Sequence, residues 1–210
     1  MQFPRSRLLL FAKAPVPGTV KTRLIPALGE AGATRLHARL VEHALALAVA
    51  AGSGLAPVEL WCAPATDHPF FAASAATHPV RLCSQRGADL GERMHHALAT
   101  ALEEAESAVL MGSDCPAIDG GYLAQAFVAL EDGADLVLGP AADGGYVLVG
   151  LRRPQPALFR HIPWGGAEVL ARTRERAHSL GLTVRELPEL WDVDRPEDLA
   201  RLRSLGWVLP

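Results

Sequence analysis

Short apolar runs alternate with longer segments of helical periodicity along most of the chain. The apolar runs predict buried strands at residues 7–12, 58–62, 80–83, 108–112, 136–139, 146–150 and 184–187. The periodic segments predict helices at residues 30–51, 69–76, 89–106, 120–130, 167–180 and 196–205. Strands that are apolar along nearly their whole length are typical of a parallel sheet covered on both faces. The pattern therefore predicts a three-layer α/β/α fold with a mostly parallel central sheet.

Proline and glycine are spread over many turns and mark no linker, so residues 1–210 are expected to form a single domain. Half of the residues are apolar and one fifth are charged, which excludes a disordered chain. No apolar run approaches the roughly 20 residues needed to span a bilayer, so membrane insertion is not expected. The three cysteines have no metal-type spacing, which fits a reducing cytoplasm. A net charge of −3 argues against a nucleic-acid partner.

The loop after the first predicted strand is a candidate phosphate-binding segment. The chain has 20 lysines and arginines, and its two lysines, Lys13 and Lys21, both lie in this loop. The loop lacks the glycine spacing of a Walker A motif. Prolines stiffen it, and a glycine would allow close backbone approach to a ligand. The expected phosphate-binding residues are Lys13, Pro15, Gly18, Lys21, Thr22 and Arg23; an ordinary loop with solvated charges is the alternative.

A carboxylate follows the strand at residues 108–112. Asp114 would lie at the tip of a buried strand, where burial is unfavourable unless a cation compensates the charge. A divalent cation that bridges this carboxylate and substrate phosphates would compensate the charge. Asp114 could equally shape the turn before Pro116.

Two aspartates alternate in an extended segment before the last predicted helix. Asp194 stands three residues ahead of Glu197, which is the spacing of a capping box. Because neighbouring side chains alternate in an extended segment, only one of Asp192 and Asp194 is expected to face a given side. One would point into the site while the other caps the helix.

Two glycine-containing loops offer further candidates. Asp143, Gly144 and Gly145 precede Tyr146, and this run indicates either a hairpin turn or a loop whose amides approach a substrate. Residues 86–94 begin a predicted helix with capping-box spacing, and Gly91 within it suggests close packing or ligand approach.

Several motifs occur in order over nearly the whole chain: FAKAPVPGTVKTRL, DLGERM, GSDCP, LGPAADGGYVLVGL, IPW and WDVDRPEDL. Together they resemble a bacterial family of glycosyltransferase-like proteins with the GT-A nucleotide-diphospho-sugar transferase fold, associated with arsenosugar biosynthesis. The chain departs from that family after Trp164, where Gly165 and Gly166 replace the usual Ser-Thr-Pro.

The resemblance implies an enzyme that binds a nucleoside diphosphate sugar together with Mg²⁺ or Mn²⁺. It implies that Lys13, Lys21 and Arg23 bind the diphosphate. Arg93 is expected to bind the nucleotide or its phosphates as well. Metal ligands would be Asp114 and Asp194, with Asp192 as the substitute. The implied sugar or acceptor residues are Asp143, Gly144, Gly145, Tyr146 and Trp164. Asp114, Lys21 and Asp143 are the expected catalytic residues, with Asp143 as the base.

The predicted function is therefore a metal-dependent transferase that uses a nucleoside diphosphate sugar as donor. The first alternative is a guanylyltransferase-like nucleotidyltransferase that releases pyrophosphate from a nucleoside triphosphate. The second is a binding module that senses nucleotide sugars without catalysis. The partner expected in each case is the nucleotide substrate or ligand, and a homodimer is compatible with all three.

Overall fold

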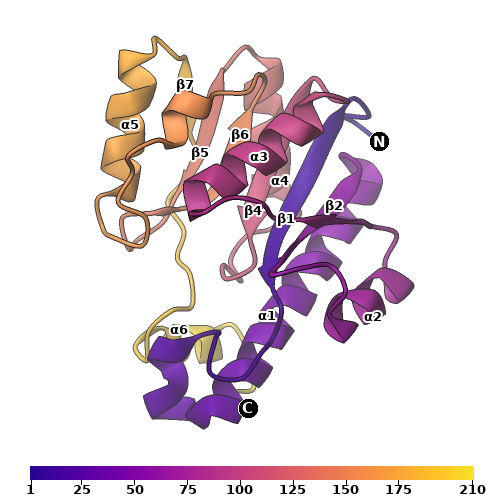
Figure 1. Cartoon of the computed structure of the whole chain (residues 1–210), viewed down its shortest axis with the longest axis vertical. Helices are drawn as coiled ribbons and strands as arrows, with labels where there is room; N and C mark the ends of the chain where they lie inside the picture. The colour runs from indigo at the N-terminus through magenta and orange to yellow at the C-terminus, as the bar shows by residue number, and fades with distance from the viewer.

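A seven-stranded sheet forms the centre of the molecule (Figure 1). The computed structural model describes the backbone of residues 1–210 and the side chains of residues 1–52 and 54–210. The strands are β1 (Ser6–Lys13), β2 (Val58–Ala63), β3 (Arg81–Ser84), β4 (Ser107–Gly112), β5 (Leu136–Pro140), β6 (Tyr146–Leu151) and β7 (Val184–Glu186). Their spatial order is β3-β2-β1-β4-β6-β5-β7. Only β6 runs antiparallel to its neighbours, so the predicted mostly parallel sheet is confirmed.

Helices cover both faces of the sheet, as the apolar strands require. One face packs against α1 (Ile25–Gly54), α2 (Pro69–Thr77) and α4 (Gly120–Glu131). The other face packs against α3 (Leu90–Leu102), the short 3-10 helix η2 (Pro156–Phe159) and α5 (Val169–Ser179). The predicted three-layer α/β/α architecture is thereby confirmed (Figure 1).

The C-terminal residues form a third, smaller core beside the main sheet. The 3-10 helix η1 (Thr22–Leu24) leads into α1, and α6 (Asp198–Ser204) packs against the first half of α1 (Figure 1). Leu36 and Leu40 of α1 share this core with Trp191 and Leu202. The carboxyl ends of β1 and β4 therefore lie close to the segment that enters α6.

Several predicted helix boundaries were wrong, among them the end of the first helix, at Gly54 rather than at residue 51, and the start of α5, at Val169 rather than at residue 167. The first helix begins at Ile25 rather than at residue 30, and Gly29 interrupts its regular geometry with a φ of 69°. α3 ends at Leu102 instead of continuing to residue 106, because the amide of Glu106 already pairs with the carbonyl of Arg5 beside the sheet. The last helix starts at Asp198 rather than at residue 196.

Helix length and polarity also bear on the membrane question. Among the described residues, no helix combines the length and apolar character that crossing a bilayer requires.

Candidate active site

A cleft of about 530 Å³ opens at the carboxyl ends of β1 and β4. Its walls come from the loop after β1, the loop after β4, the start of β6 and the segment before α6. Among the residues proposed from the sequence, those that line it are Lys13, Lys21, Thr22, Arg23, Asp114, Tyr146, Asp192 and Asp194. Loops that are remote in sequence meet here because adjacent parallel strands end at the same edge of the sheet.

Lys21 joins three of these walls. Its backbone is left-handed, with a φ of 48°, and its side chain is only 3% exposed. The Nζ atom lies 2.8 Å from Oδ2 of Asp114 and donates to the carbonyl of Val193 at 2.5 Å. One buried ammonium therefore connects the loop after β1 to the loop after β4 and to the C-terminal segment.

Asp114 is held in its charged form by its surroundings. Burial disfavours the carboxylate, but the charge of Lys21 and hydrogen bonds from Lys21 and Ser113 outweigh burial and keep the pKa of Asp114 below its usual value. The Ser113 hydroxyl donates to Oδ1 at 3.3 Å. The carboxylate side chain remains 41% exposed, so it can reach a ligand in the cleft.

His37, which the sequence analysis missed, forms part of the cleft floor. The residue is 4% exposed, and its Nε2–H donates to the carbonyl of Lys13 at 3.0 Å. Its Nδ1 lies 3.9 Å from Oδ1 of Asp114 and has no hydrogen-bond partner. Burial lowers the pKa of His37. The signal that could have found it is a polar residue on the apolar stripe that contains Leu36 and Leu40.

The two alternating aspartates both line the cleft, so the expectation that one faces the site and the other caps the helix was wrong. α6 has no side-chain cap; instead, Oδ2 of Asp198 in its first turn accepts from the amides of Asp194 and Arg195, which precede the helix, at 2.9 and 2.7 Å. The Asp194 carboxylate caps no helix and forms an ion pair with Arg23. Burial, followed by the nearby charge of Asp143, raises the pKa of Asp192 to about 6.

The predicted hairpin between β5 and β6 is confirmed, and its turn lies outside the cleft lining. Oδ1 of Asp143 accepts from the amide of Gly145 at 2.8 Å. Gly144 has a φ of 89°, and a Cβ atom there would lie 2.1 Å from the carbonyl oxygen of Ala167. The glycines therefore have a structural role in the turn, while Asp143 is close enough to affect Asp192.

Trp164 packs behind the cleft wall rather than lining it. Its ring lies edge-on to Tyr146 and covers Gly91, where a Cβ atom would approach the indole to 2.5 Å. Close packing thus explains the glycine in α3. The capping-box spacing there is also used, because Asp89 accepts from the amide of Glu92 at 2.8 Å.

Three of the proposed phosphate-binding residues do not line the cleft: Pro15, Gly18 and Arg93. Gly18 adopts a φ of 72° beside the carboxylate of Glu30. Nε of Arg93 donates to the carbonyl of Gly87 at 3.1 Å. Lys13, by contrast, lines the cleft with an exposed side chain, and no ion pair of Lys13 occurs among the described side chains.

The aspartates fit a divalent cation only in part. Carboxylate oxygens are the ligands that Mg²⁺ and Mn²⁺ prefer, and the raised pKa of Asp192 reflects burial and carboxylates without enough positive charge nearby. Within the described part of the chain, however, no group of three or more His, Cys, Asp or Glu side chains could hold a metal ion. A site with one or two carboxylates remains, and such sites bind Mg²⁺ when substrate phosphates complete the coordination.

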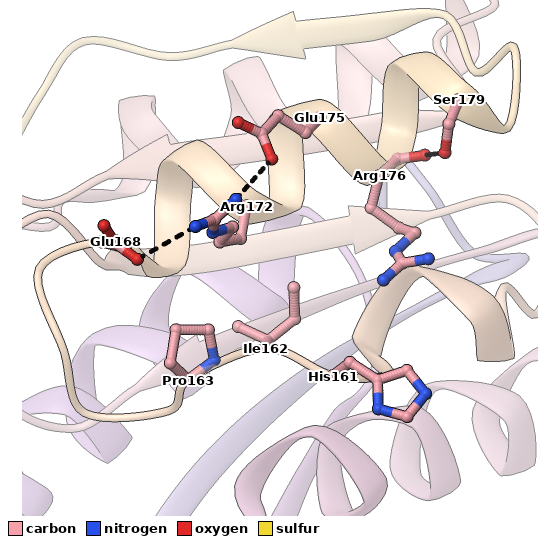
Figure 2. A pocket seen from close by; sticks show the side chains of 8 residues that line it. All are labelled: His161, Ile162, Pro163, Glu168, Arg172, Glu175, Arg176 and Ser179. Atoms are coloured by element: carbon pink, nitrogen blue, oxygen red, sulfur yellow. Dashed lines mark hydrogen bonds and ion pairs between the residues drawn. The ribbon is translucent and has the colours of Figure 1, made fainter.

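A second hollow, of about 710 Å³, lies between α5 and the loop at residues 161–163 (Figure 2). Arg172 projects from α5 and pairs with Glu168 and Glu175 at 3.4 and 3.1 Å. Exposed ion pairs of this kind contribute little to the stability of the fold. The hollow shares no lining residue with the cleft and contains none of the residues proposed from the sequence.

Sequence comparison relates the chain to a bacterial family. Residues 46–166 match the family described as "Uncharacterized protein conserved in bacteria (DUF2064)". A "putative nucleotide-diphospho-sugar transferase" from Desulfovibrio desulfuricans G20 is 34% identical, covers 97% of this chain and 88% of its own, and superposes with a TM-score of 0.87. No curated protein matches the sequence.

More distant solved structures share the fold. CMP:2-keto-3-deoxy-manno-octonic acid synthetase complexed with CTP is 12% identical, with a TM-score of 0.61 over 96% of this chain and 98% of that one. Glucosyl-3-phosphoglycerate synthase from Mycobacterium tuberculosis, in complex with Mn²⁺ and UDP, is 14% identical, with a TM-score of 0.58 over 97% of this chain and 75% of that one. At these identities the similarity concerns the fold alone.

Proposed function

The chain belongs to the DUF2064 family and to the nucleotide-diphospho-sugar transferase superfamily, and from this we propose that it is a metal-dependent transferase with a nucleoside diphosphate sugar as donor. The observation that carries the proposal is the convergence of Lys13, Lys21, Arg23 and the aspartates on one cleft. Opposite charges in one cleft suit a ligand that has both phosphates and hydroxyl groups.

Lys13 is the residue best placed to bind the diphosphate in this proposal. Its ammonium lies at the cleft and is exposed, whereas Lys21 and Arg23 are paired with Asp114 and Asp194. Negative charge grows on the departing diphosphate as the sugar is transferred, and a cation already positioned in the cleft stabilises that charge. Lys21 contributes by fixing the Asp114 carboxylate, which together with Asp192 would hold the divalent ion. Such an ion, when bound, acts as a Lewis acid toward the phosphates.

The acceptor side of the cleft is assigned to the β5–β6 hairpin. Tyr146 lines the cleft there, and Asp143, in the turn outside the lining, is close enough to Asp192 for its charge to raise the pKa of that residue. We assign Asp143 the role of the base that takes the proton of the attacking acceptor group. Trp164 supports this wall through Tyr146 and is not assigned a direct contact with the acceptor.

The test is a turnover assay with Mg²⁺ or Mn²⁺ and a panel of nucleotide sugars and nucleoside triphosphates, followed by mass spectrometry of the products. A donor sugar that is consumed with release of the nucleoside diphosphate supports the proposal. Pyrophosphate released from a triphosphate would instead establish the nucleotidyltransferase alternative. Binding without turnover of either class would establish the binding module.

Thermal unfolding tests the metal assignment separately. With ligand at about 100 times its dissociation constant, Mn²⁺ and a nucleoside diphosphate should stabilise the native state by about 2.7 kcal/mol, or raise Tm by roughly 5–10 °C. Asp114→Ala should abolish the metal-dependent part of this shift. Asp67→Asn, on an exposed loop outside the cleft, is the matched control and should keep it. A full shift in Asp114→Ala would refute the assignment.

A further inference from the structure

We propose that His37 is a positioning residue of the cleft, which keeps the Lys13 end of β1 and the Asp114 carboxylate at the spacing that a diphosphate requires. The inference rests on the proposed function and adds a residue that neither the sequence motifs nor the resemblance assigned. Four observations support it: the burial of the imidazole, its contact with Lys13, its contact with Asp114 and its place in α1.

The burial of His37 needs an explanation beyond packing. Leu36 and Leu40 flank it on the buried side of α1, and both pack in the small C-terminal core. A leucine or methionine at position 37 would continue the apolar stripe without the unfavourable desolvation of an imidazole. The polar ring is therefore expected to serve its contacts at the cleft.

The first contact fixes the end of β1. A carbonyl oxygen can only accept, so the hydrogen of the imidazole lies on Nε2 and points to Lys13. Lys13 is the last residue of β1, and the next amide, that of Ala14, donates to Ala63 of β2 at 2.8 Å. His37 thus ties α1 to the residue at which the sheet ends and the loop with the cationic side chains begins.

The second contact concerns Asp114 at the end of the neighbouring strand. With the hydrogen on Nε2, the Nδ1 atom has a lone pair that faces Oδ1 of Asp114 at 3.9 Å. Two acceptors do not form a hydrogen bond, so the ring packs against the carboxylate without neutralising it. Lys21 occupies Oδ2, and the negative charge of the group remains available to a ligand.

These contacts place the imidazole between two neighbouring strand ends. β1 and β4 are paired in register, so Lys13 and Asp114 both follow the same edge of the sheet. Loss of the ring would free the Lys13 carbonyl and open a space behind the Asp114 carboxylate. A ligand that contacts both residues would then have to order them on binding, and its affinity would fall.

The experiment measures binding of inorganic pyrophosphate in the presence of Mn²⁺ to the full-length protein by calorimetry, with free Mn²⁺ counted by electron paramagnetic resonance. His37→Leu keeps most of the side-chain volume but loses both ring nitrogens. It should bind pyrophosphate about five- to tenfold more weakly, which corresponds to the free energy of one net hydrogen bond. His37→Gln can still donate to Lys13 from its amide, and it should recover affinity to within about threefold of the wild type, within the range of one weak contact.

The matched control is His96→Leu. His96 lies on α3 against the ring of Trp61 and does not line the cleft. Its variant should bind pyrophosphate as the wild type does. If His37→Leu does not fold, His37→Asn replaces it, because asparagine is polar but too short to reach Lys13 and should show the same loss.

The outcomes separate this inference from the proposed function. Unchanged affinity in a folded His37→Leu variant, or equal weakening in His37→Gln and His37→Leu, would overturn the positioning role alone. Wild-type protein that binds neither Mn²⁺ nor pyrophosphate would overturn the proposed function and, with it, the inference. A loss in His37→Leu with recovery in His37→Gln supports both, because a purely structural role would lower Tm without this rescue.

Discussion

Replacing Lys21 by methionine removes the ammonium that joins three segments of the cleft while keeping most of the side-chain volume. The change leaves Oδ2 of Asp114 without its partner at 2.8 Å and the Val193 carbonyl without its donor at 2.5 Å. Both contacts are long-range in sequence, so neighbouring residues cannot replace them. The variant therefore isolates the contribution of one buried charge to the fold and to the site.

The magnitude follows from the exposure of the two partners. Breaking a fully buried ion pair costs about 3–5 kcal/mol, whereas a hydrogen bond to a charged group contributes about 1.5–3 kcal/mol. Lys21 is buried, but the Asp114 side chain is 41% exposed, so water can partly solvate the remaining carboxylate. We expect a loss of about 2–3 kcal/mol, or a Tm lower by roughly 4–12 °C for a chain of this size.

The assay is urea unfolding followed by circular dichroism, with Lys13→Met as the matched lysine control. Lys13 is exposed, so its variant should unfold within about 0.5 kcal/mol of the wild type. A double-mutant cycle with Asp114→Asn should give a coupling of about 1–2 kcal/mol between Lys21 and Asp114. The reasoning would be wrong if Lys21→Met unfolded with the stability of the wild type, or if the cycle showed no coupling.

The pH dependence supplies an independent check. The pKa of Asp114 is held below its usual value, so the unfolded state takes up the proton first as pH falls. The stabilisation by Lys21 is therefore complete at neutral pH and is lost as pH falls below about 4 and through the folded pKa. The difference between wild type and Lys21→Met should shrink in that window.

Two further predictions concern neighbouring positions. Because the pKa of Asp192 is raised to about 6, its ionisation destabilises the folded state as pH rises from about 4 to 6. Asp192→Asn should therefore stabilise the protein by about 1–3 kcal/mol at pH 7 in urea unfolding. Below about pH 4 the variant and the wild type should be equally stable. Gly144→Ala combines a φ of 89° with a clash at the Ala167 carbonyl and should lower the free energy of unfolding by more than about 2 kcal/mol. Gly181→Ala has a φ of 66° and open space, so it should lower the free energy of unfolding by about 1–2 kcal/mol. Equal losses of the two variants in calorimetric unfolding would contradict the clash.

The hydrophobic pattern determined the layers of this protein. Apolar strands and amphipathic helices are signals within a few residues, so the order of elements, the sheet and the β5–β6 hairpin could be predicted without coordinates. The motif after β4 and the two lysines also identified loops that meet at one cleft, because carboxyl ends of parallel strands share an edge.

Only the tertiary structure decided how those loops share their charges. Lys21 and Val193 are 172 positions apart, and no local pattern indicates that one ammonium serves both this carbonyl and Asp114. Asp194 has the capping-box spacing in the sequence, but its carboxylate pairs with Arg23, and α6 has no side-chain cap. Such choices depend on burial and on distances between side chains in space, and these exist only once the chain is packed.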